Sequence, residues 1–304
     1  MIQDPQPDFR PVPGEAETLA PGLRRVLAPN PSPMTFRGTN TYLIGDGDLA
    51  IIDPGPDSEI HLSSLLQAIG SDHVSAILVT HAHVDHSPLA KALSQQVDAP
   101  VYAFSDAQGG RSAVMQQLAR SGLVGGGEGV DESFAPDITL ADGDVVTGHG
   151  WRLRALHTPG HFGNHLSFAW DDTLFCGDLV MGWASSLVSP PDGDLTDFMA
   201  SCHRLQNKDW SVFHSGHGAP ITDPSERLEW LIAHRLSRES AVLTALRDGP
   251  ATSATLAARI YTETPAALLP AATRNVLAHL IDLHGKNIVT PIDELHADAE
   301  FRLI

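Results

Sequence analysis

Three histidines and one aspartate crowd together directly after the apolar run 74–79; they are His81, His83, Asp85 and His86. The run predicts a buried strand, so the cluster lies on the loop at its carboxyl end, where open α/β sheets bind their ligands. If the strand continued, His86 would point away from His81 and His83, so only a loop gathers all four side chains. Imidazole and carboxylate groups bind zinc and similar divalent ions. The cluster therefore predicts a metal site, with a merely histidine-rich polar loop as the alternative.

Three later turns repeat this arrangement of a polar side chain after a strand. The residues are His161, Asp178 and His217, which follow the predicted strands 151–156, 173–176 and 210–213. Each lies on a glycine-containing turn, where the backbone can bend toward a shared centre. One such turn has little value, but the ordered set argues strongly against a chance histidine-rich loop.

Charge and length limit the partners of the chain. Its 304 residues suffice for one large domain, or for a large domain and a small one. The 19 basic and 37 acidic side chains give a formal charge of −18. This charge repels polyanions, so a nucleic acid or an anionic membrane would need a local basic patch. Apart from Arg24-Arg25, the basic residues are scattered, which argues against a nucleic-acid partner.

Cysteine content and apolar runs predict the compartment. Cys176 and Cys202 are too few for a disulfide framework and suit a reducing environment. Residues 1–15 are acidic and rich in proline, unlike a secretory signal. No apolar run approaches the ~20 residues that span a bilayer. We therefore expect a soluble, cytoplasmic protein with no membrane partner.

The remaining patterns predict an α/β protein in which strands and helices alternate twice, as two similar halves packed face to face. Residues 1 to about 20 read as a loose lead-in, and the glycine-rich stretch 122–129 as a mobile loop. Ser87 is the expected N-cap of a helix with Pro88 at its first position. The predicted strands are 23–27, 41–44, 49–52, 74–79, 101–104, 145–146, 151–156, 166–170, 173–176 and 210–213; the predicted helices are 58–69, 112–119 and 195–205, besides the one after Ser87.

A second unit follows residue 222. Asp223 and Glu226 form a capping box that opens a helix, and Gly249-Pro250 ends it. Helices over 253–261 and 271–284 and a short tail follow, in a sequence rich in alanine. We therefore divide the chain into residues 1–222 and residues 223–304.

As a set, the histidine cluster and the later turns resemble the metallo-β-lactamase-fold hydrolase superfamily over roughly residues 20 to 220. Gly38 to Thr41 and Asp53-Pro54-Gly55 resemble its early strands. The resemblance implies a four-layer αββα sandwich with the site at one edge of the two sheets. It also implies the ligands of two metal ions: His81, His83 and His161 for one, Asp85, His86 and His217 for the other, and Asp178 bridging both.

Seven ligands for two divalent ions leave positions open for water and substrate, as catalysis requires. A hydroxide held between two ions ~3.5–4 Å apart is a strong nucleophile near neutral pH. Zinc is the expected metal, and the same ligands accept iron or manganese. We expect Asp53 to accept a hydrogen bond from one ligand histidine. Besides Asp85 and Asp178, His165 is a candidate catalytic residue; it either contacts substrate or merely ends a turn.

The chain departs from its relatives at three places. At the bridging position this chain has Asp178, unlike the class B β-lactamases that carry cysteine there. Ser87-Pro88 replaces the glycine pair that often follows the first cluster, and Phe162 replaces a threonine. None of these changes removes a ligand, but they reshape the pocket wall.

The C-terminal segment, mainly residues 271–288, resembles the winged-helix-like appendage of the β-lactamase-like protein 2 group, which includes endoribonucleases and relatives of thioesterases. Our first hypothesis is a dinuclear metal hydrolase of a small ester, thioester or lactone. The second is a metal-dependent endoribonuclease or phosphodiesterase, which the negative charge opposes. The third is a redox or binding protein like the flavodiiron proteins, opposed by the lack of a flavin-binding domain. Residues 223–304 are expected to shape the substrate mouth or an oligomer contact, a homodimer included.

Overall fold

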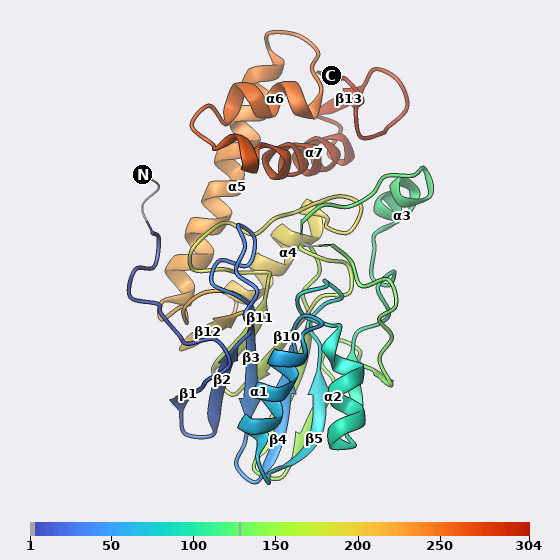
Figure 1. The fold of residues 1–304 in the computed structure, drawn as a ribbon. Helices are drawn as coiled ribbons and strands as arrows, with labels where there is room; N and C mark the ends of the chain where they lie inside the picture. Colours follow the sequence, from blue (N-terminus) through green and yellow to red (C-terminus); the bar gives the residue numbers. More distant parts are fainter. Residues whose placement is uncertain (1–3, 128) are drawn as a thin grey trace.

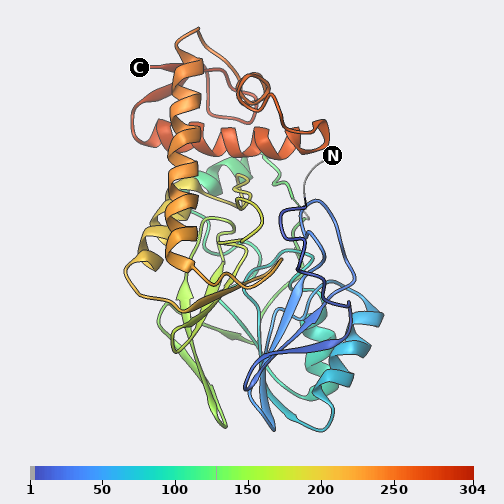
Figure 2. The same cartoon turned by 90° about the vertical axis from the view of Figure 1, so that its left-hand side faces the viewer.

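The computed structural model describes residues 4–127 and 129–304 (Figure 1). The first three residues of the expected lead-in and Glu128 of the expected mobile loop lie outside the described residues. Two β-sheets pack face to face, with helices on both outer faces (Figure 2). A smaller, mostly helical module sits over one end of this sandwich.

The first sheet has seven strands in sequence order. They are β1 (Ala16–Ala20), β2 (Leu23–Leu27), β3 (Asn40–Ile44), β4 (Asp48–Ile52), β5 (His73–Leu78), β6 (Val101–Ala103) and β7 (Ile138–Thr139). Strands β1 to β4 are antiparallel, and β4 to β7 are parallel. The prediction of a loose lead-in to residue 20 was wrong, because residues 16–20 pair with β2 as an edge strand.

The second sheet has five strands in the order β12-β11-β10-β9-β8. They are β8 (Val145–Gly148), β9 (Trp151–His157), β10 (Leu166–Trp170), β11 (Thr173–Gly177) and β12 (Val212–Ser215). Strand β12 runs parallel to β11, whereas the other pairs are antiparallel. The carboxyl ends of β11 and β12 therefore lie at one edge, where Asp178 and His217 follow them.

Helices α1 (Glu59–Ile69) and α2 (Leu89–Val97) cover the first sheet, and α4 (Leu195–Gln206) and the start of α5 (Pro224–Leu246) cover the second. Strand β4 shows how the layers form. Leu49 and Ile51 point to α1 and α2, while Ala50 and Ile52 point to the other sheet. Burial on both faces is typical of a central strand. The fold is the predicted four-layer αββα sandwich.

The helix after the histidine cluster begins later than predicted. Helix α2 starts at Leu89, and Pro88 occupies the N-cap position. Ser87 does not cap it, because its hydroxyl lies 2.9 Å from the Asp131 carboxylate and donates to it. This bond ties the end of the histidine loop to a neighbouring loop.

The C-terminal module consists of the second half of α5, α6 (Ser253–Ile260), the 3-10 turn η1 (Ala266–Leu268), α7 (Leu269–Gly285) and a two-stranded sheet of β13 (Val289–Pro291) and β14 (Phe301–Leu303). Helix α5 belongs to both cores: Leu231 packs against the sandwich and Val242 against the module. Helix α3 (Ala113–Arg120), from the first unit, also adds Met115 to the module's core. The two units therefore share apolar contacts.

Within the described ranges, no helix combines the length and the apolar character needed to cross a membrane.

The packing of α5 predicts a contrast between two leucines. Leu231 is fully buried against the sandwich, whereas Leu236 is 51% exposed. Leu231→Ala should lower the free energy of unfolding in urea by ~2–5 kcal/mol, because it leaves a cavity. Leu236→Ala should change it by less than ~0.5 kcal/mol. Equal effects would show that α5 does not dock as described.

Candidate metal centre

The histidine loop is fixed to the end of β4 by one carboxylate. Asp53 Oδ1 accepts from the Thr80 backbone N–H at 2.7 Å, and its Oδ2 accepts from the Thr80 hydroxyl at 2.7 Å. The loop then turns back, since the N–H of His86 donates to the carbonyl of His83 at 3.0 Å. This turn brings His86 beside the other ligand candidates, as predicted.

Three histidines form the first group. His83 Nδ1 lies 2.9 Å from His81 Nε2 and 3.1 Å from His161 Nε2. His161 Nδ1 donates to the Leu187 carbonyl at 2.7 Å, so Nε2 presents a lone pair. His81 Nδ1 donates to Thr80 Oγ1 at 2.9 Å, because that hydroxyl already donates to Asp53. Nitrogens on a tetrahedral zinc ion lie about 3.3 Å apart, so this spacing suits one shared ion.

Asp85, His86 and His217 form the second group. His217 Nε2 lies 3.1 Å from Asp85 Oδ2, and His86 Nε2 lies 3.4 Å from the same oxygen. The outer nitrogens are held: His86 Nδ1 contacts Asp53 Oδ2 at 2.9 Å, and His217 Nδ1 contacts the Gly38 carbonyl at 3.1 Å. The contact with His86 confirms the hydrogen bond expected for Asp53.

Asp178 lies between the two groups. Its Oδ2 is 3.3 Å from His217 Nε2 and 3.7 Å from His161 Nε2, and its Oδ1 is 3.5 Å from His86 Nε2. Gly216 makes room for it, because a Cβ at that position would come within 2.3 Å of Asp178 Oδ1. The carboxylate thus faces both groups.

Polar atoms without partners test whether these residues fit metal ions. Asp85 Oδ1, His86 Nε2 and Asp178 Oδ1 are buried, and none has a hydrogen-bond partner among the described residues. A buried, unpaired polar atom is costly. Divalent cations at this centre would satisfy all three atoms, and three sets of ligand atoms each lie within 4.8 Å of one another. The donor set therefore fits metal binding.

The electrostatics separate the histidines into two kinds. Burial lowers the pKa of His83 to about 3 and that of His81 well below its usual value, so both are neutral. Burial also opposes protonation of His217, but the Asp178 and Asp85 carboxylates raise its pKa to about 10. The pKa of His86 is likewise raised against burial, by Asp85 and Asp178. Without metal, these two histidines hold protons in place of cations.

His165 lies beneath the centre and not in a cavity. It is fully buried, and its Nε2 accepts from the Asp178 backbone N–H at 3.2 Å. Its Nδ1 therefore carries the proton and donates to Thr158 Oγ1 at 3.0 Å. Of the two possibilities for His165, this geometry favours a structural role, because the ring does not line the cavity beside the centre and holds the Asp178 backbone.

A cavity of about 240 Å³ opens beside the centre. His83, Asp85 and Asp178 lie on its wall, together with His161 and His217. Residues of the C-terminal module line the same cavity. These residues are Tyr261, Thr264, Leu268, Ala271, Ala272 and Asn275. No sequence motif marks these residues, because their position depends on how α6 and α7 pack.

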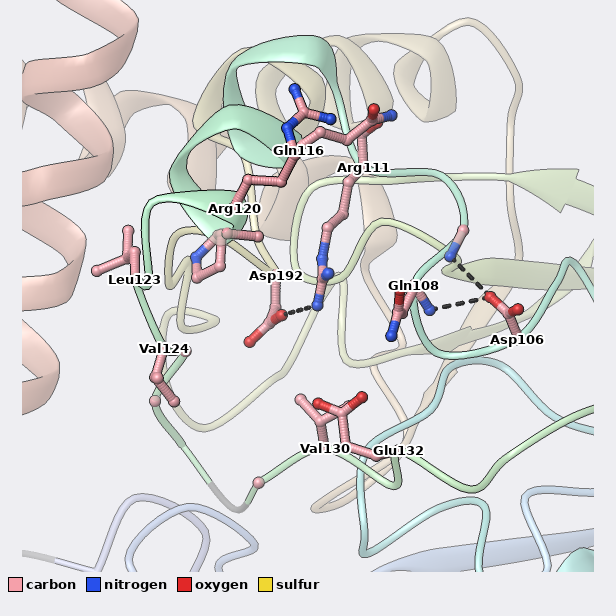
Figure 3. A pocket seen from close by; sticks show the side chains of 16 residues that line it. Asp106, Gln108, Arg111, Gln116, Arg120, Leu123, Val124, Val130, Glu132 and Asp192 are labelled. Atoms are coloured by element: carbon pink, nitrogen blue, oxygen red, sulfur yellow. Dashed lines mark hydrogen bonds and ion pairs between the residues drawn. The ribbon is translucent and has the colours of Figure 1, made fainter. Parts of the chain in front are cut away.

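A second, wider cleft of about 860 Å³ lies near the glycine-rich stretch (Figure 3). Several of its charged side chains bond to other groups of the protein. Arg111 Nη2 contacts Asp192 Oδ1 at 2.6 Å, and Asp106 accepts from the backbone N–H groups of Gln108 and Gly109. Ser112, the N-cap of α3, also donates to Asp194 at 2.7 Å. These bonds fix α3 to the loop that contains Leu187.

Comparison with known families shows to which superfamily the chain belongs. The model of the metallo-beta-lactamase superfamily matches residues 34–263. The chain belongs to the metallo-beta-lactamase superfamily. The beta-lactamase associated winged helix domain matches residues 252–295, so the helical module with its β13-β14 hairpin is a winged-helix domain, as the sequence indicated.

Superfamily members similar to this chain include a beta-lactamase-like protein 2 homolog of Drosophila melanogaster, 31% identical over 93% of this chain and 94% of that protein. An atrochrysone carboxyl ACP thioesterase of Aspergillus fumigatus is 28% identical over 83% of this chain and 77% of its own length. Among solved structures, a metallo-beta-lactamase family protein of Thermus thermophilus superposes with a TM-score of 0.75 and 28% identity, over 94% of this chain and 100% of that one.

Protons on His86 and His217 should compete with metal ions. Because their pKa values lie above the usual value, zinc binding near neutral pH must displace protons, and the affinity should rise as pH rises. Zinc titration calorimetry in buffers of different ionisation enthalpy measures this release. An affinity that is equal at about pH 6 and about pH 8 would contradict the assignment.

Because Asp178 lies between the two groups, two substitutions at this position should differ in zinc content. Asp178→Ala should lower the zinc content from about two ions per chain to one or none, because one carboxylate faces both groups. Asp178→Cys should retain at least one ion, since thiolate is a good zinc ligand. Elemental analysis after reconstitution measures both, with the exposed Asp209→Ala as control. An unchanged content in the alanine variant would disprove the bridging role.

Proposed function

We propose that this protein is a dinuclear metal-dependent hydrolase of small esters, thioesters or lactones, and that acyl thioesters are its preferred substrates. One observation carries the proposal: buried donor atoms, three of them without partners, converge beside a substrate-sized cavity. A purely structural cluster would satisfy those atoms within the protein.

The residues that would hold the ions are those of the two groups. His81, His83 and His161 would bind one ion, Asp85, His86 and His217 the other, and Asp178 both. Zinc is the metal that we propose, and iron or manganese suits the same ligands. When bound, the two ions supply a water nucleophile at neutral pH and polarise the scissile carbonyl.

The protein's own groups supply orientation and a dry environment. Asp53 and the carbonyls of Gly38 and Leu187 fix the ring orientation of His86, His217 and His161; such partners keep ligands in place. His165 holds the backbone of Asp178. The apolar side chains of Met34, Met181, Leu187 and Leu268 line the cavity and limit water around the acyl group.

Two points favour a thioester. Several similar proteins carry the name atrochrysone carboxyl ACP thioesterase, at 28–30% identity. The cavity is apolar beside the centre, which suits an acyl chain. Asp178 stands where class B β-lactamases have cysteine, which weakens a β-lactam substrate.

An endoribonuclease is the alternative. The formal charge of −18 opposes it, because phosphate contacts depend on Lys and Arg. One basic side chain of the C-terminal module, Lys286, is also offset by acids: it contacts Glu239 at 3.1 Å and Asp282 at 2.7 Å. We therefore propose a small-molecule substrate. We also propose a cytoplasmic location, which the two buried free cysteines suit.

A substrate screen tests the proposal. Zinc-, iron- and manganese-loaded protein should hydrolyse at least one acyl thioester, ester or lactone, and a chelator should abolish the activity. Asp85→Asn should lower kcat by at least about 10²-fold, because it disturbs an ion's ligand set. Absence of turnover on all three classes by protein that contains two ions would refute the proposal.

Measurements of RNA binding and RNA cleavage distinguish the small-molecule hydrolase from the endoribonuclease. At ~150 mM salt we expect no RNA binding and no inhibition of hydrolysis by competitor RNA. Tight, steeply salt-dependent RNA binding that is lost without the C-terminal module, together with RNA cleavage, would establish the nuclease instead.

A further inference from the structure

The C-terminal module lines part of the cavity beside the metal centre, and its Tyr261 and Asn275 carry hydrogen-bond donors that meet no acceptor among the described residues. Tyr261 follows the last residue of α6, and Asn275 lies on α7. Both line the same cavity as His83 and Asp178. Neither belongs to the sandwich that holds the metal ligands.

The orientation of Asn275 is fixed by its partners. Its Oδ1 accepts from the Val188 N–H at 3.1 Å and from Arg235 Nη1 at 2.9 Å. Both partners are donors, so they can only face the amide oxygen. The amide nitrogen must point elsewhere, and within the described residues it meets no acceptor. Asn275 therefore presents N–H donors to the cavity.

The surroundings make Asn275 rigid. Arg235 is 2% exposed, donates also to the Ser186 carbonyl, and lies over the Phe198 ring at 5.0 Å. Residues 186–188 thus hold Asn275 on one side. On the other side the Leu187 carbonyl holds His161. The distance between the amide and the metal centre is set by one short loop.

Tyr261 supplies the second donor. Its ring lies 4.8 Å from the guanidinium of Arg238, which fixes the ring plane. Its hydroxyl has no partner in the described part of the chain. Burial raises the pKa of Tyr261, so the hydroxyl keeps its proton at neutral pH. A protonated hydroxyl on a cavity wall can donate to an oxygen of a ligand.

Much of the remaining cavity wall is apolar. Met34, Met181 and Leu187 contribute to it from the sandwich, and Leu268 and Ala271 from the module. A substrate with its scissile carbonyl at the centre would lay its acyl chain along this wall, which Tyr261 and Asn275 also line. A plain alkyl end would leave these donors without acceptors, which is unfavourable.

We propose that Tyr261 and Asn275 form a subsite for acyl substrates whose acyl chain carries a neutral oxygen acceptor, a keto or hydroxyl group, beyond the scissile carbonyl. The inference rests on the proposed hydrolase function and names its substrate class. A neutral oxygen is the proposed acceptor because the two donor groups on the wall are uncharged. Arg235 and Arg238 lie behind Asn275 and Tyr261 and do not line the cavity.

The test uses matched N-acetylcysteamine thioesters, 3-oxobutanoyl against butanoyl and 5-oxohexanoyl against hexanoyl. The readout is the ratio of kcat/KM for the oxo and plain members of a pair, compared between each variant and the parent, so that intrinsic reactivity cancels. Tyr261→Phe and Asn275→Asp should each reduce this ratio about tenfold for at least one pair. Asn275→Asp keeps the acceptor for Val188 and Arg235, so the local structure is retained.

Leu236→Ala, on the exposed face of α5, is the control and should keep the parent ratio. Variants are compared at equal metal content and melting temperature. A ratio unchanged in both variants, for both pairs, overturns the subsite. An equal loss on oxo and plain substrates overturns it as well, because that loss would be structural.

Binding separates the subsite from the hydrolase function. Calorimetry should show that metal-loaded protein binds 5-oxohexanoate more tightly than hexanoate, with the difference lost in Tyr261→Phe. If no thioester is turned over but this binding difference is present, the proposed function fails and the subsite stands. If thioesters are hydrolysed without oxo preference and the two acids bind equally, the function stands and the subsite fails.

Discussion

The structure depends on a buried cluster of carboxylate and imidazole groups whose charges must be balanced by metal ions or by protons. Two carboxylates and five imidazoles point buried donor atoms at one another, within 2.9–3.7 Å at the closest. The hydrogen bonds of their outer atoms direct lone pairs inward. In the metal-free chain, protons on His86 and His217 compensate the charges of Asp85 and Asp178. Metal ions would take the place of those protons and satisfy the oxygens that lack partners.

The fold holds in place the groups that form hydrogen bonds with the outer nitrogens of the ligand histidines. Each comes from a different element: Asp53 follows β4, Gly38 precedes β3, and Leu187 lies in the loop before α4. That loop is held in turn by Asn275 and Arg235 of the winged-helix module. The module therefore belongs to the structure that surrounds the candidate metal centre. A loosened module should disturb both the orientation of His161 and the part of the cavity wall that the module forms.

The sequence predicted which side chains would come together, because each candidate ligand follows a strand with a clear apolar pattern, and carboxyl ends of strands meet at one edge. It failed where the structure depends on the direction of a side chain or on the pairing of a mostly exposed edge strand. His165 ends a turn, but only the structure shows that it faces the Asp178 backbone. Residues 16–20 are mostly exposed and form a strand only by pairing with β2. Tyr261 and Asn275 reach the cavity through helix packing, which no local motif encodes.

Anomalous X-ray diffraction from crystals of the zinc-loaded protein would locate the metal ions. We expect two zinc peaks ~3.5–4 Å apart. Nitrogens of His81, His83 and His161 should lie ~2.0–2.1 Å from one peak, and Asp178 should contact both. A single peak, peaks away from these residues, or an Asp178 carboxylate that contacts neither ion would contradict the account.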